Sequence, residues 1–316
     1  MVRTRIFFTC DIHGSEVCFR KFVNAGKFYR VDILILGGDL TGKRIIPILE
    51  QPDGSYRATF LGKDYSVRSR EELERLERLI RDSGCYPYRT HPDELAELSD
   101  ESKLHRVFLQ LIRESLERWI SIAEERLKDT GIRCFIMPGN DDPPQVGEIL
   151  EQSEFIINPE GKVVEVDPHH EMISLGYSNL TPWRCPRDIP ENELKAKIEQ
   201  LVSEVENLEN CIFNLHCPPY DSGLDMAPAL DENLRPIVKG GQIYYVAVGS
   251  TAVRESIETY QPLLGLHGHI HESRGVCRIG RTLCLNPGSE YTEGILRGAI
   301  LNLDEKKVKG YALTSG

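Results

Sequence analysis

Short apolar runs that end in polar residues recur along the chain, and this pattern predicts buried strands that feed chemically active loops. The first run, residues 5–10 (RIFFTC), is followed at once by Asp11 and His13. The second run lies within residues 31–40 (VDILILGGDL) and ends in Gly-Gly-Asp. Apolar runs of four to eight residues bounded by turn residues are typical of strands buried on both faces. A helical pattern at roughly 15–29 separates them, which predicts an α/β fold with loops at one sheet edge.

The alternation stops after Asp39 and resumes only at residues 133–140 (RCFIMPGN). A break of this length in a regular α/β pattern indicates an insertion. We therefore expect residues 1–316 to form a single domain, with an inserted cap or accessory subdomain at about 43–105. The alternative to an accessory subdomain is a surface insertion without a functional role. A chain of this length fits one large domain or a domain with a sizeable insertion.

Inside the insertion, residues 43–67 predict a hairpin whose turn is PDGS at residues 52–55. Ser69 and Glu72 have the spacing of a capping box, so a helix is expected to begin there and to stop at Gly84. Its apolar stripe needs a surface to pack on, either the scaffold or another subunit. The remaining predictions are a loop at residues 85–92 (CYPYRTHP) and a long helix to about Lys128. The insertion is therefore expected to be largely helical.

The second half of the chain repeats strand and helix patterns. The first predicted elements are a short helix capped by Asp142 before two prolines, and a hairpin at 155–176 that contains NPEGK. A helix at roughly 191–208 and a buried strand at 211–219 are expected next. The last predicted elements are a helix at about 250–260, a strand leading into 262–271, and tail strands within 275–313.

Composition and charge restrict the classes of function. The chain is 40% hydrophobic and 28% charged, as globular proteins are, and its formal net charge is −11. This negative charge argues against strong general binding to nucleic acid, and the basic tract EKKVK at 305–309 is short. No apolar run is long enough for a membrane span, and the first one is too short for a signal peptide. Nine scattered cysteines without a CxxC pair indicate free thiols in a reducing cytoplasm.

Five polar clusters follow the predicted strands. They are Asp11 with His13, Asp39, Asn140, His216, and His269 with His271. Most of them have an ordinary explanation, because Asp, Asn and Gly suit turns and a single His often only hydrogen-bonds within a loop. Three imidazoles within HGHIH at residues 267–271 are rarely needed for packing, so this cluster favours a binding role.

The spacing of residues within the clusters suggests that their side chains converge. Residues two apart in an extended strand point the same way, so Asp11 and His13 are expected to aim at one point, as are His269 and His271. Three glycines allow close approach beside them: Gly38, Gly139 and Gly268. Carboxylates, imidazoles and an amide oxygen suit manganese, iron, zinc or nickel. Seven ligands exceed those of one four-coordinate zinc, which favours two divalent metal ions sharing a carboxylate.

In chain order, the motifs D-x-H, G-D, G-N-x-D, a strand-end His and G-H-x-H resemble those of the calcineurin-like metallophosphoesterases. The resemblance covers nearly the whole chain outside the insertion, and NPGS at 286–289 is similar to the C-terminal end of many members. It implies a sandwich of two mixed sheets flanked by helices, with both metals at strand ends. The ligands it implies are Asp11, His13 and His271 for one metal, Asn140, His216 and His269 for the other, and Asp39 for both.

The resemblance further implies a phosphoesterase in which a hydroxide between two metals attacks a small phosphorylated substrate. Asp39, Asn140, Asp141 and His216 are then the expected catalytic residues. The family usually has His at the position of Asp141, where it helps the leaving group. An ionised aspartate is a poor proton donor, so we expect diesters or activated esters to be preferred over alkyl monoesters. His267 is open as a substitute or as a supporting residue.

Two alternatives to a small-substrate phosphodiesterase stay open. A nuclease of the same family needs a basic groove, which the sequence does not indicate. A non-catalytic scaffold needs missing metal ligands, whereas all seven positions are filled. The sequence leaves the metals, the substrate and the oligomeric state undecided.

Overall fold

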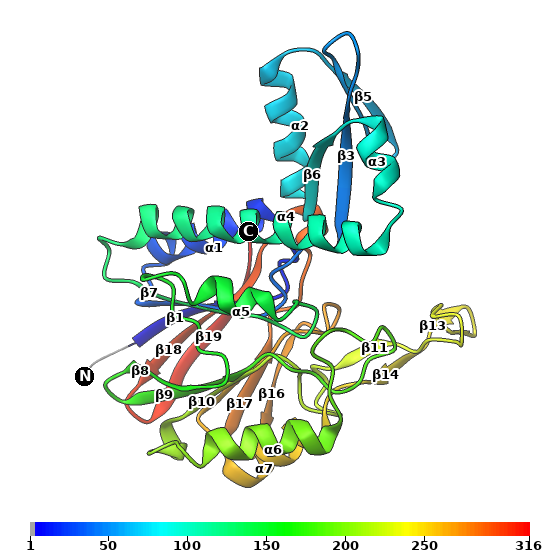
Figure 1. Ribbon diagram of the computed structural model, residues 1–316. Coiled ribbons are helices and arrows are strands. Elements are labelled where there is room, and N and C mark those ends of the chain that lie inside the picture. The colour runs from blue at the N-terminus through cyan, green and yellow to red at the C-terminus, as the bar shows by residue number, and fades with distance from the viewer. Residues whose placement is uncertain (1–3) are drawn as a thin grey trace.

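The computed structural model describes residues 4–316, and two mixed β-sheets form its centre (Figure 1). One sheet contains, in spatial order, β19 (Lys307–Ser315), β18 (Arg297–Asp304), β1 (Thr4–Thr9), β2 (Ile33–Gly37) and β7 (Arg133–Met137). The other contains β16 (Gly275–Ile279), β17 (Thr282–Asn286), β15 (Leu264–Leu266), β10 (Ile212–Leu215), β9 (His170–Leu175) and β8 (Val163–Asp167).

The central strands of both sheets are parallel. In the first sheet β1, β2 and β7 run in the same direction, and in the second β9, β10, β15 and β17 do. Antiparallel partners flank them, namely β18 and β19 on one sheet and β16 and β8 on the other. Parallel strands covered on both faces need nearly continuous apolar sequence. All five residues of β2 are accordingly buried.

The sheets pack face to face, and helices cover their outer faces. Phe8 and Ile35 of the first sheet share a core with Met172 and Leu264 of the second. The helices α1 (Glu16–Phe28), α4 (Glu101–Leu127) and α5 (Gln145–Leu150) cover the first sheet, and α6 (Glu191–Val202) and α7 (Thr251–Tyr260) cover the second (Figure 1). The sandwich of two mixed sheets flanked by helices, expected from the sequence, is confirmed.

The segment between β2 and α4 folds around its own sheet. Its elements are β3 (Arg44–Glu50), β4 (Tyr56–Phe60), β5 (Lys63–Val67), α2 (Arg70–Asp82), β6 (Cys85–Thr90) and α3 (Pro92–Glu97), with the strand order β5-β4-β3-β6. Ile48 and Phe60 pack with Leu76 and Ile80 of α2 in a separate core. The segment stands clear of the sandwich beside one end of α4 (Figure 1).

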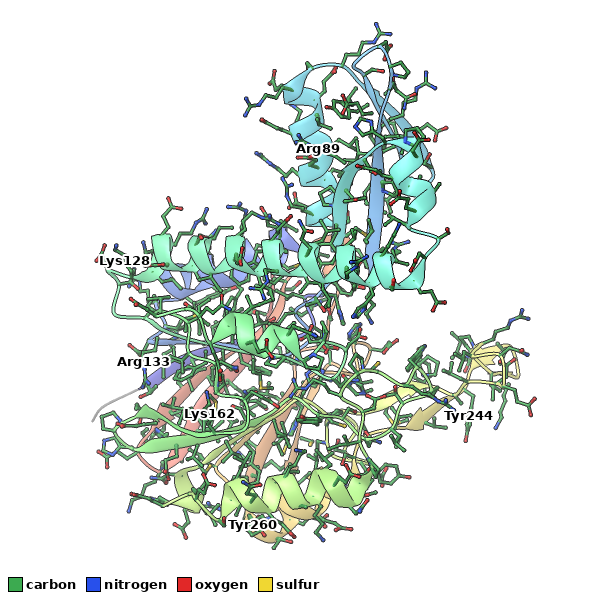
Figure 2. The ribbon with its side chains drawn as sticks, viewed as in Figure 1. Arg89, Lys128, Arg133, Lys162, Tyr244 and Tyr260 are labelled. Carbon is green, nitrogen blue, oxygen red and sulfur yellow. The ribbon has the colours of Figure 1, made fainter. Side chains whose placement is uncertain are left out.

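The predicted hairpin with its turn at residues 52–55 is present as β3 and β4, and β5 adds a third strand. Two other predictions for this segment were wrong. The segment is not largely helical, because it contains a four-stranded sheet, and residues 85–90, expected as a loop, form β6 parallel to β3. Pro87 argued against a strand in the sequence, because proline has no N–H to donate to a neighbouring strand. Proline is tolerated in β6 because β6 is an edge strand. The capping box at Ser69 is present and begins α2. Arg89 of β6, labelled in Figure 2, forms an ion pair with Glu77 of that helix.

Three details of the second half also differ from the sequence predictions. The β8–β9 turn falls at residues 168–169, after the NPEGK segment at 158–162. The helix expected to about residue 208 ends at Val202. The N-cap of α5 is Pro144, and the carboxylate of Asp142 makes other bonds described below.

A narrow arm extends from the second sheet's side of the molecule (Figures 1 and 2). It comprises β11 (Met226–Pro228) paired with β14 (Tyr245–Ala247), and β12 (Val238–Lys239) paired with β13 (Gln242–Ile243).

None of the helices within residues 4–316 is both long and apolar enough to cross a membrane.

The separate core of the inserted segment leads to a stability prediction. Ile80 is fully buried in that core. Replacing it with alanine removes buried methyl groups and leaves a cavity, which costs about 2–5 kcal/mol in comparable cores. Ile80→Ala should therefore increase amide hydrogen exchange throughout residues 44–97 and leave β1 and β2 protected.

Leu79→Ala is the matched control, because the neighbouring Leu79 on α2 is 40% exposed. It should change exchange in the segment much less than Ile80→Ala does. Equal effects of the two substitutions would show that α2 does not pack on this core through Ile80.

Candidate metal centre

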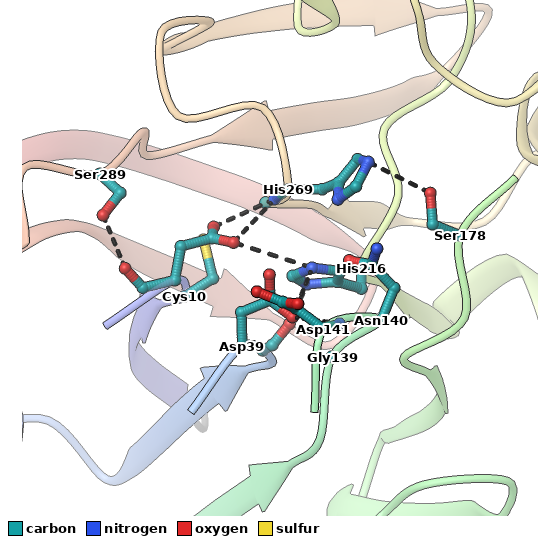
Figure 3. Close-up of polar contacts among 12 residues, drawn as sticks. Cys10, Asp39, Gly139, Asn140, Asp141, Ser178, His216, His269 and Ser289 are labelled. Atoms are coloured by element: carbon teal, nitrogen blue, oxygen red, sulfur yellow. Dashed lines mark hydrogen bonds and ion pairs between the residues drawn. The ribbon is translucent and has the colours of Figure 1, made fainter. Parts of the chain in front are cut away.

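The strand-end clusters meet where the carboxyl ends of the parallel strands of both sheets converge. Asp11 follows β1, Asp39 follows β2, and Asn140 follows β7, while His216 and His269 follow β10 and β15. Chain segments far apart in sequence thus contribute to one buried cluster (Figure 3). Such convergence is typical of ligand sites in open α/β sheets.

The backbone in these loops is not extended, which corrects the reasoning from spacing. Asp11, His13, Asp39 and His269 have positive φ angles of 55°, 38°, 53° and 66°. Left-handed backbone at residues other than glycine is uncommon and concentrates at functional sites. Backbone bonds hold the first two loops together: Asp11 N–H donates to Gly38 O at 3.0 Å, and His13 N–H donates to Asp39 O at 3.0 Å.

Two sets of side chains each offer ligand atoms within 4.8 Å of one another. One set is Asp11, His13 and His271, and the other is Asp39, His216 and His269. His13, Asp39 and Asp141 form a third, overlapping set. The first two sets contain six of the seven predicted ligands.

Asn140, the seventh predicted ligand, contributes a buried side-chain oxygen to the same cluster. Its side-chain nitrogen donates to Asp188 Oδ1 at 2.8 Å, which leaves Asn140 Oδ1 buried and without a partner among residues 4–316. Likewise His216 Nδ1 contacts Gly37 O at 2.8 Å, and its buried Nε2 has no hydrogen-bond partner in the described chain. Leaving a buried polar atom unsatisfied costs about 1–3 kcal/mol, and a cation would satisfy both atoms. The residues therefore fit divalent metal ions.

The charges of the cluster are balanced by histidines. Burial opposes ionisation of Asp11 and Asp39, but contact with His271 and the charge of His216 hold the pKa of Asp11 well below its usual range. The charge of His216 does the same to the pKa of Asp39. Burial works against the imidazolium of His216, yet the neighbouring Asp39 and Asp11 raise its pKa to about 10. Burial lowers the pKa of His13 and of His269 to about 4.

Supporting residues fix the loops. The Asp142 carboxylate accepts the backbone N–H of Gly139 at 2.7 Å, of Leu40 at 2.9 Å and of Thr41 at 2.8 Å, so it ties the β2 loop to the β7 loop. This is why it does not cap α5. Burial, with the charge of Asp39, raises the pKa of Asp142 to about 6. Ser178 Oγ lies 3.2 Å from His269 Nε2 (Figure 3).

The three glycines are required by close packing. A Cβ on Gly38 would lie 2.6 Å from His216 Nδ1, and one on Gly268 would lie 2.5 Å from Asp11 Oδ2. A Cβ on Gly139 would overlap the carboxylate of Asp39. The predicted close approach at these positions therefore has a direct geometric basis.

His267 does not face the cluster. It is fully buried, its Nδ1 lies 2.8 Å from Leu215 O, and its ring packs against Gly265. Burial lowers the pKa of His267 to about 4. Because this ring is fully buried, we do not expect His267 to substitute for the His absent at position 141.

Sequence reasoning missed Asp188 and Lys43. Asp188 lies in a loop after β9, and only its contact with Asn140 identifies it. Lys43 forms an ion pair with Asp141 Oδ2, at the point where the inserted segment leaves the sandwich. No motif marks either residue, because each acts through a contact distant in sequence.

Comparisons with known proteins agree with the fold and leave function open. No protein-family model matches the chain. Uncharacterized protein MJ1162 of Methanocaldococcus jannaschii is 33% identical over 153 residues, 48% of this chain. The match spans 62% of that curated relative's length.

Solved structures are similar at low sequence identity. The structure of TT1561 from Thermus thermophilus matches with a TM-score of 0.54 and 15% identity, over 100% of this chain and 99% of that one. A predicted phosphoesterase from Streptococcus pneumoniae matches with a TM-score of 0.29 and 10% identity, over 100% of this chain and 99% of that one. The first match supports the two-sheet fold, and the second is too weak to support an argument.

The contact between Asn140 and Asp188 generates a prediction about metal affinity. Asp188→Ala removes the acceptor that orients the amide of Asn140. Loss of such an orienting partner typically weakens metal binding about 10–100-fold. Competition of the protein with a chelating dye for manganese should show this loss for one of the ions.

Asp231→Ala is a suitable control, because Asp188 and Asp231 each accept two backbone N–H groups and Asp231 lies on the arm, away from the centre. Its manganese affinity should equal that of the unmodified protein. Equal affinity in Asp188→Ala as well would remove Asp188 from the account of the site.

The raised pKa of His216 generates a second prediction. At pH 7 the metal-free cluster holds His216 as an imidazolium, and a metal ligand must be neutral. Metal binding should therefore release at least one proton, and affinity should rise with pH by up to about tenfold per unit for each proton. Calorimetric titration with manganese in buffers of different ionisation enthalpy counts the protons released.

His169→Ala should release the same number of protons, because His169 is a surface residue outside the cluster. Binding of manganese with no proton release by the unmodified protein would contradict the assigned charge state of His216.

Proposed function

We propose that the protein is a dinuclear, metal-dependent phosphoesterase that hydrolyses small phosphodiester or nucleotide-type substrates. The observation that carries this proposal is the pair of unsatisfied buried atoms, Asn140 Oδ1 and His216 Nε2, beside two triads of ligand atoms. Asp39 belongs to the second triad and also approaches the first, since its carboxylate is 3.4 Å from His216 Nε2 and 3.6 Å from His13 Nε2.

The proposed ligand sets follow from these positions and from the resemblance of the motifs. Asp11, His13 and His271 would hold one ion, Asn140, His216 and His269 would hold the other, and Asp39 would bind both. Two ions in such a site supply Lewis acidity and activate water for attack on phosphorus. Manganese, iron, zinc and nickel all suit this mixture of oxygen and nitrogen ligands.

A cavity beside His271 supports a small substrate. Its volume is about 490 Å³, within the range of small-molecule pockets. His271, Arg274 and Tyr291 line it, together with Ser289 and Arg297. Its two arginines suit an anionic substrate, but three glutamates, Glu272, Glu290 and Glu293, also line the cavity, and Arg297 pairs with Glu290. A substrate bound in this cavity would lie beside His271 of the first triad.

The absence of His at position 141 bears on the substrate. With Asp141 at the centre, this chain lacks an imidazole there to protonate a poor leaving group. Diesters, phosphoanhydrides and aryl esters depend less on such a donor than alkyl monoesters do. We therefore propose a preference for phosphodiesters. Residence in a reducing cytoplasm stays a prediction from the sequence.

A nuclease and a non-catalytic scaffold are less well supported. The inserted segment and the arm carry both signs of charge, and the formal net charge of −11 does not favour a nucleic-acid groove. A scaffold does not need the unsatisfied acceptor of Asn140. The small-substrate enzyme therefore accounts for more of the geometry.

The experiment is an activity panel with metal replacement. Protein loaded with manganese, nickel, iron or zinc should hydrolyse at least one class among phosphomonoesters, phosphodiesters, cyclic nucleotides and oligonucleotides. Diesters should have the highest kcat/KM, chelation should abolish turnover, and Asp39→Asn should lose much of both ions with at least about 100-fold of the activity.

Asp32→Asn provides the control, because Asp32 precedes β2 at the opposite end from Asp39 and accepts the backbone N–H of Arg5. It should keep two metal equivalents and full turnover. Full activity of protein holding one equivalent would reject the dinuclear site, and inactivity on every ester class with every metal would reject the enzyme.

A further inference from the structure

Lys43 connects the inserted segment to the candidate metal centre. It is the residue immediately before β3, and its ammonium contacts Asp141 Oδ2. That carboxylate oxygen lies 3.9 Å from His13 Nδ1, and the backbone N–H of Asp141 donates to Asp39 Oδ1 at 3.1 Å. The ammonium therefore lies one side chain away from the expected metal ligands.

The backbone before Lys43 is held rigidly. Gly42 N–H donates to Tyr86 Oη at 2.8 Å, so β6 of the inserted segment anchors it. A Cβ on Gly84 would overlap His13 O, and it would lie 3.2 Å from the ring of Tyr291. Close packing thus fixes the base of the inserted segment against the loop of His13.

The Lys43 side of this pair is open to an incoming ligand, whereas the bonded oxygen, Asp141 Oδ2, is buried. The side chain of Lys43 is 55% exposed and that of Asp141 is 22% exposed, whereas Asp11 and Asp39 are buried. Tyr291 packs against His13 with ring centroids 4.8 Å apart and also lines the cavity beside His271. Lys43 therefore lies on the solvent-accessible side of the centre.

The pair is accessible to solvent on its Lys43 side only, where screening weakens the attraction between the two charges. An unpaired Asp141 carboxylate, by contrast, would repel an anionic phosphoryl group at close range. An ammonium has three N–H donors, so Lys43 retains donors for a ligand while it neutralises Asp141.

We propose that Lys43 binds a phosphoryl oxygen of the substrate and that Asp141 is the positioning residue that holds its ammonium at the centre. This inference rests on the proposed function and names how that site admits an anionic phosphate despite the aspartate at position 141. The inserted segment then has a specific task, which is to deliver the substrate-binding cation.

Binding of inorganic phosphate to the manganese-loaded protein tests the proposal without catalysis. Lys43→Met should weaken phosphate binding about 10–100-fold, as expected for loss of a charge-assisted hydrogen bond. Lys43→Arg should keep most of the affinity. Two manganese equivalents and the melting temperature should be unchanged in both variants. Calorimetry gives the affinity, and elemental analysis gives the metal content.

Lys103→Met is the matched control, because Lys103 forms an exposed ion pair with Glu97 at 3.0 Å, away from the centre. Its phosphate affinity should equal that of the unmodified protein. Unchanged affinity in Lys43→Met, or an equal loss in Lys103→Met, would overturn the proposal.

A double-mutant cycle tests the role given to Asp141. In the Lys43→Met background, Asp141→Asn should restore part of the phosphate affinity, because it removes the carboxylate that Lys43 no longer neutralises. With intact Lys43, Asp141→Asn should raise KM more than it lowers kcat. Loss of a manganese equivalent in Asp141→Asn would identify Asp141 as a metal ligand and overturn its positioning role.

The phosphate measurement and the activity panel separate this inference from the proposed function. Loss of phosphate binding in Lys43→Met, with every ester uncleaved by the unmodified protein, would support the Lys43 site and reject the phosphoesterase. Ester hydrolysis with phosphate binding and KM unchanged in Lys43→Met would reject the Lys43 site alone. Failure of the metal-loaded, unmodified protein to bind phosphate would also reject the Lys43 site.

Discussion

Two buried carboxylates, Asp11 and Asp39, impose the constraint on which the rest of the centre depends. Each is almost completely inaccessible to solvent, and burying charge without a partner is strongly unfavourable. His216 Nε2 lies 3.7 Å from Asp11 and 3.4 Å from Asp39, so its positive charge offsets both carboxylates without a hydrogen bond to either. A cluster that must collect positive charge in a buried space is well suited to divalent cations.

The fold meets this constraint by bringing five strand ends together. The loops after β1, β2 and β7 come from one sheet, and those after β10 and β15 come from the other. Asp142 joins two of these loops through backbone N–H groups, and Asp188 orients the amide of Asn140. The left-handed backbone at Asp11 and Asp39 is held by this packing, which offsets its local strain. A rigid scaffold of this kind fixes ligand positions before any ion binds.

Much of this arrangement could be predicted from the sequence, because apolar runs and the polar residues that follow them are local signals. The α/β strands and the placing of Asp11, Asp39 and His216 at strand ends belong to that part, whereas the two-sheet sandwich was implied by the resemblance of the motifs. One assumption behind the prediction was wrong: the backbone at Asp11 and His13 was expected to be extended, and it is not. The strand β6 was missed because it contains Pro87, which an edge strand tolerates. Lys43 and Asp188 could not be found, because their roles depend on contacts with Asp141 and Asn140 about a hundred and about fifty residues away.

The most direct test of the central claim is anomalous X-ray diffraction from crystals of the protein grown with manganese. The account predicts two peaks about 3.5–4 Å apart, with Asp39 between them. One peak should contact Asp11, His13 and His271, and the other should contact Asn140, His216 and His269. A single peak, or a second ion held by Asp141 while Asn140 Oδ1 stays without a metal, would contradict the account.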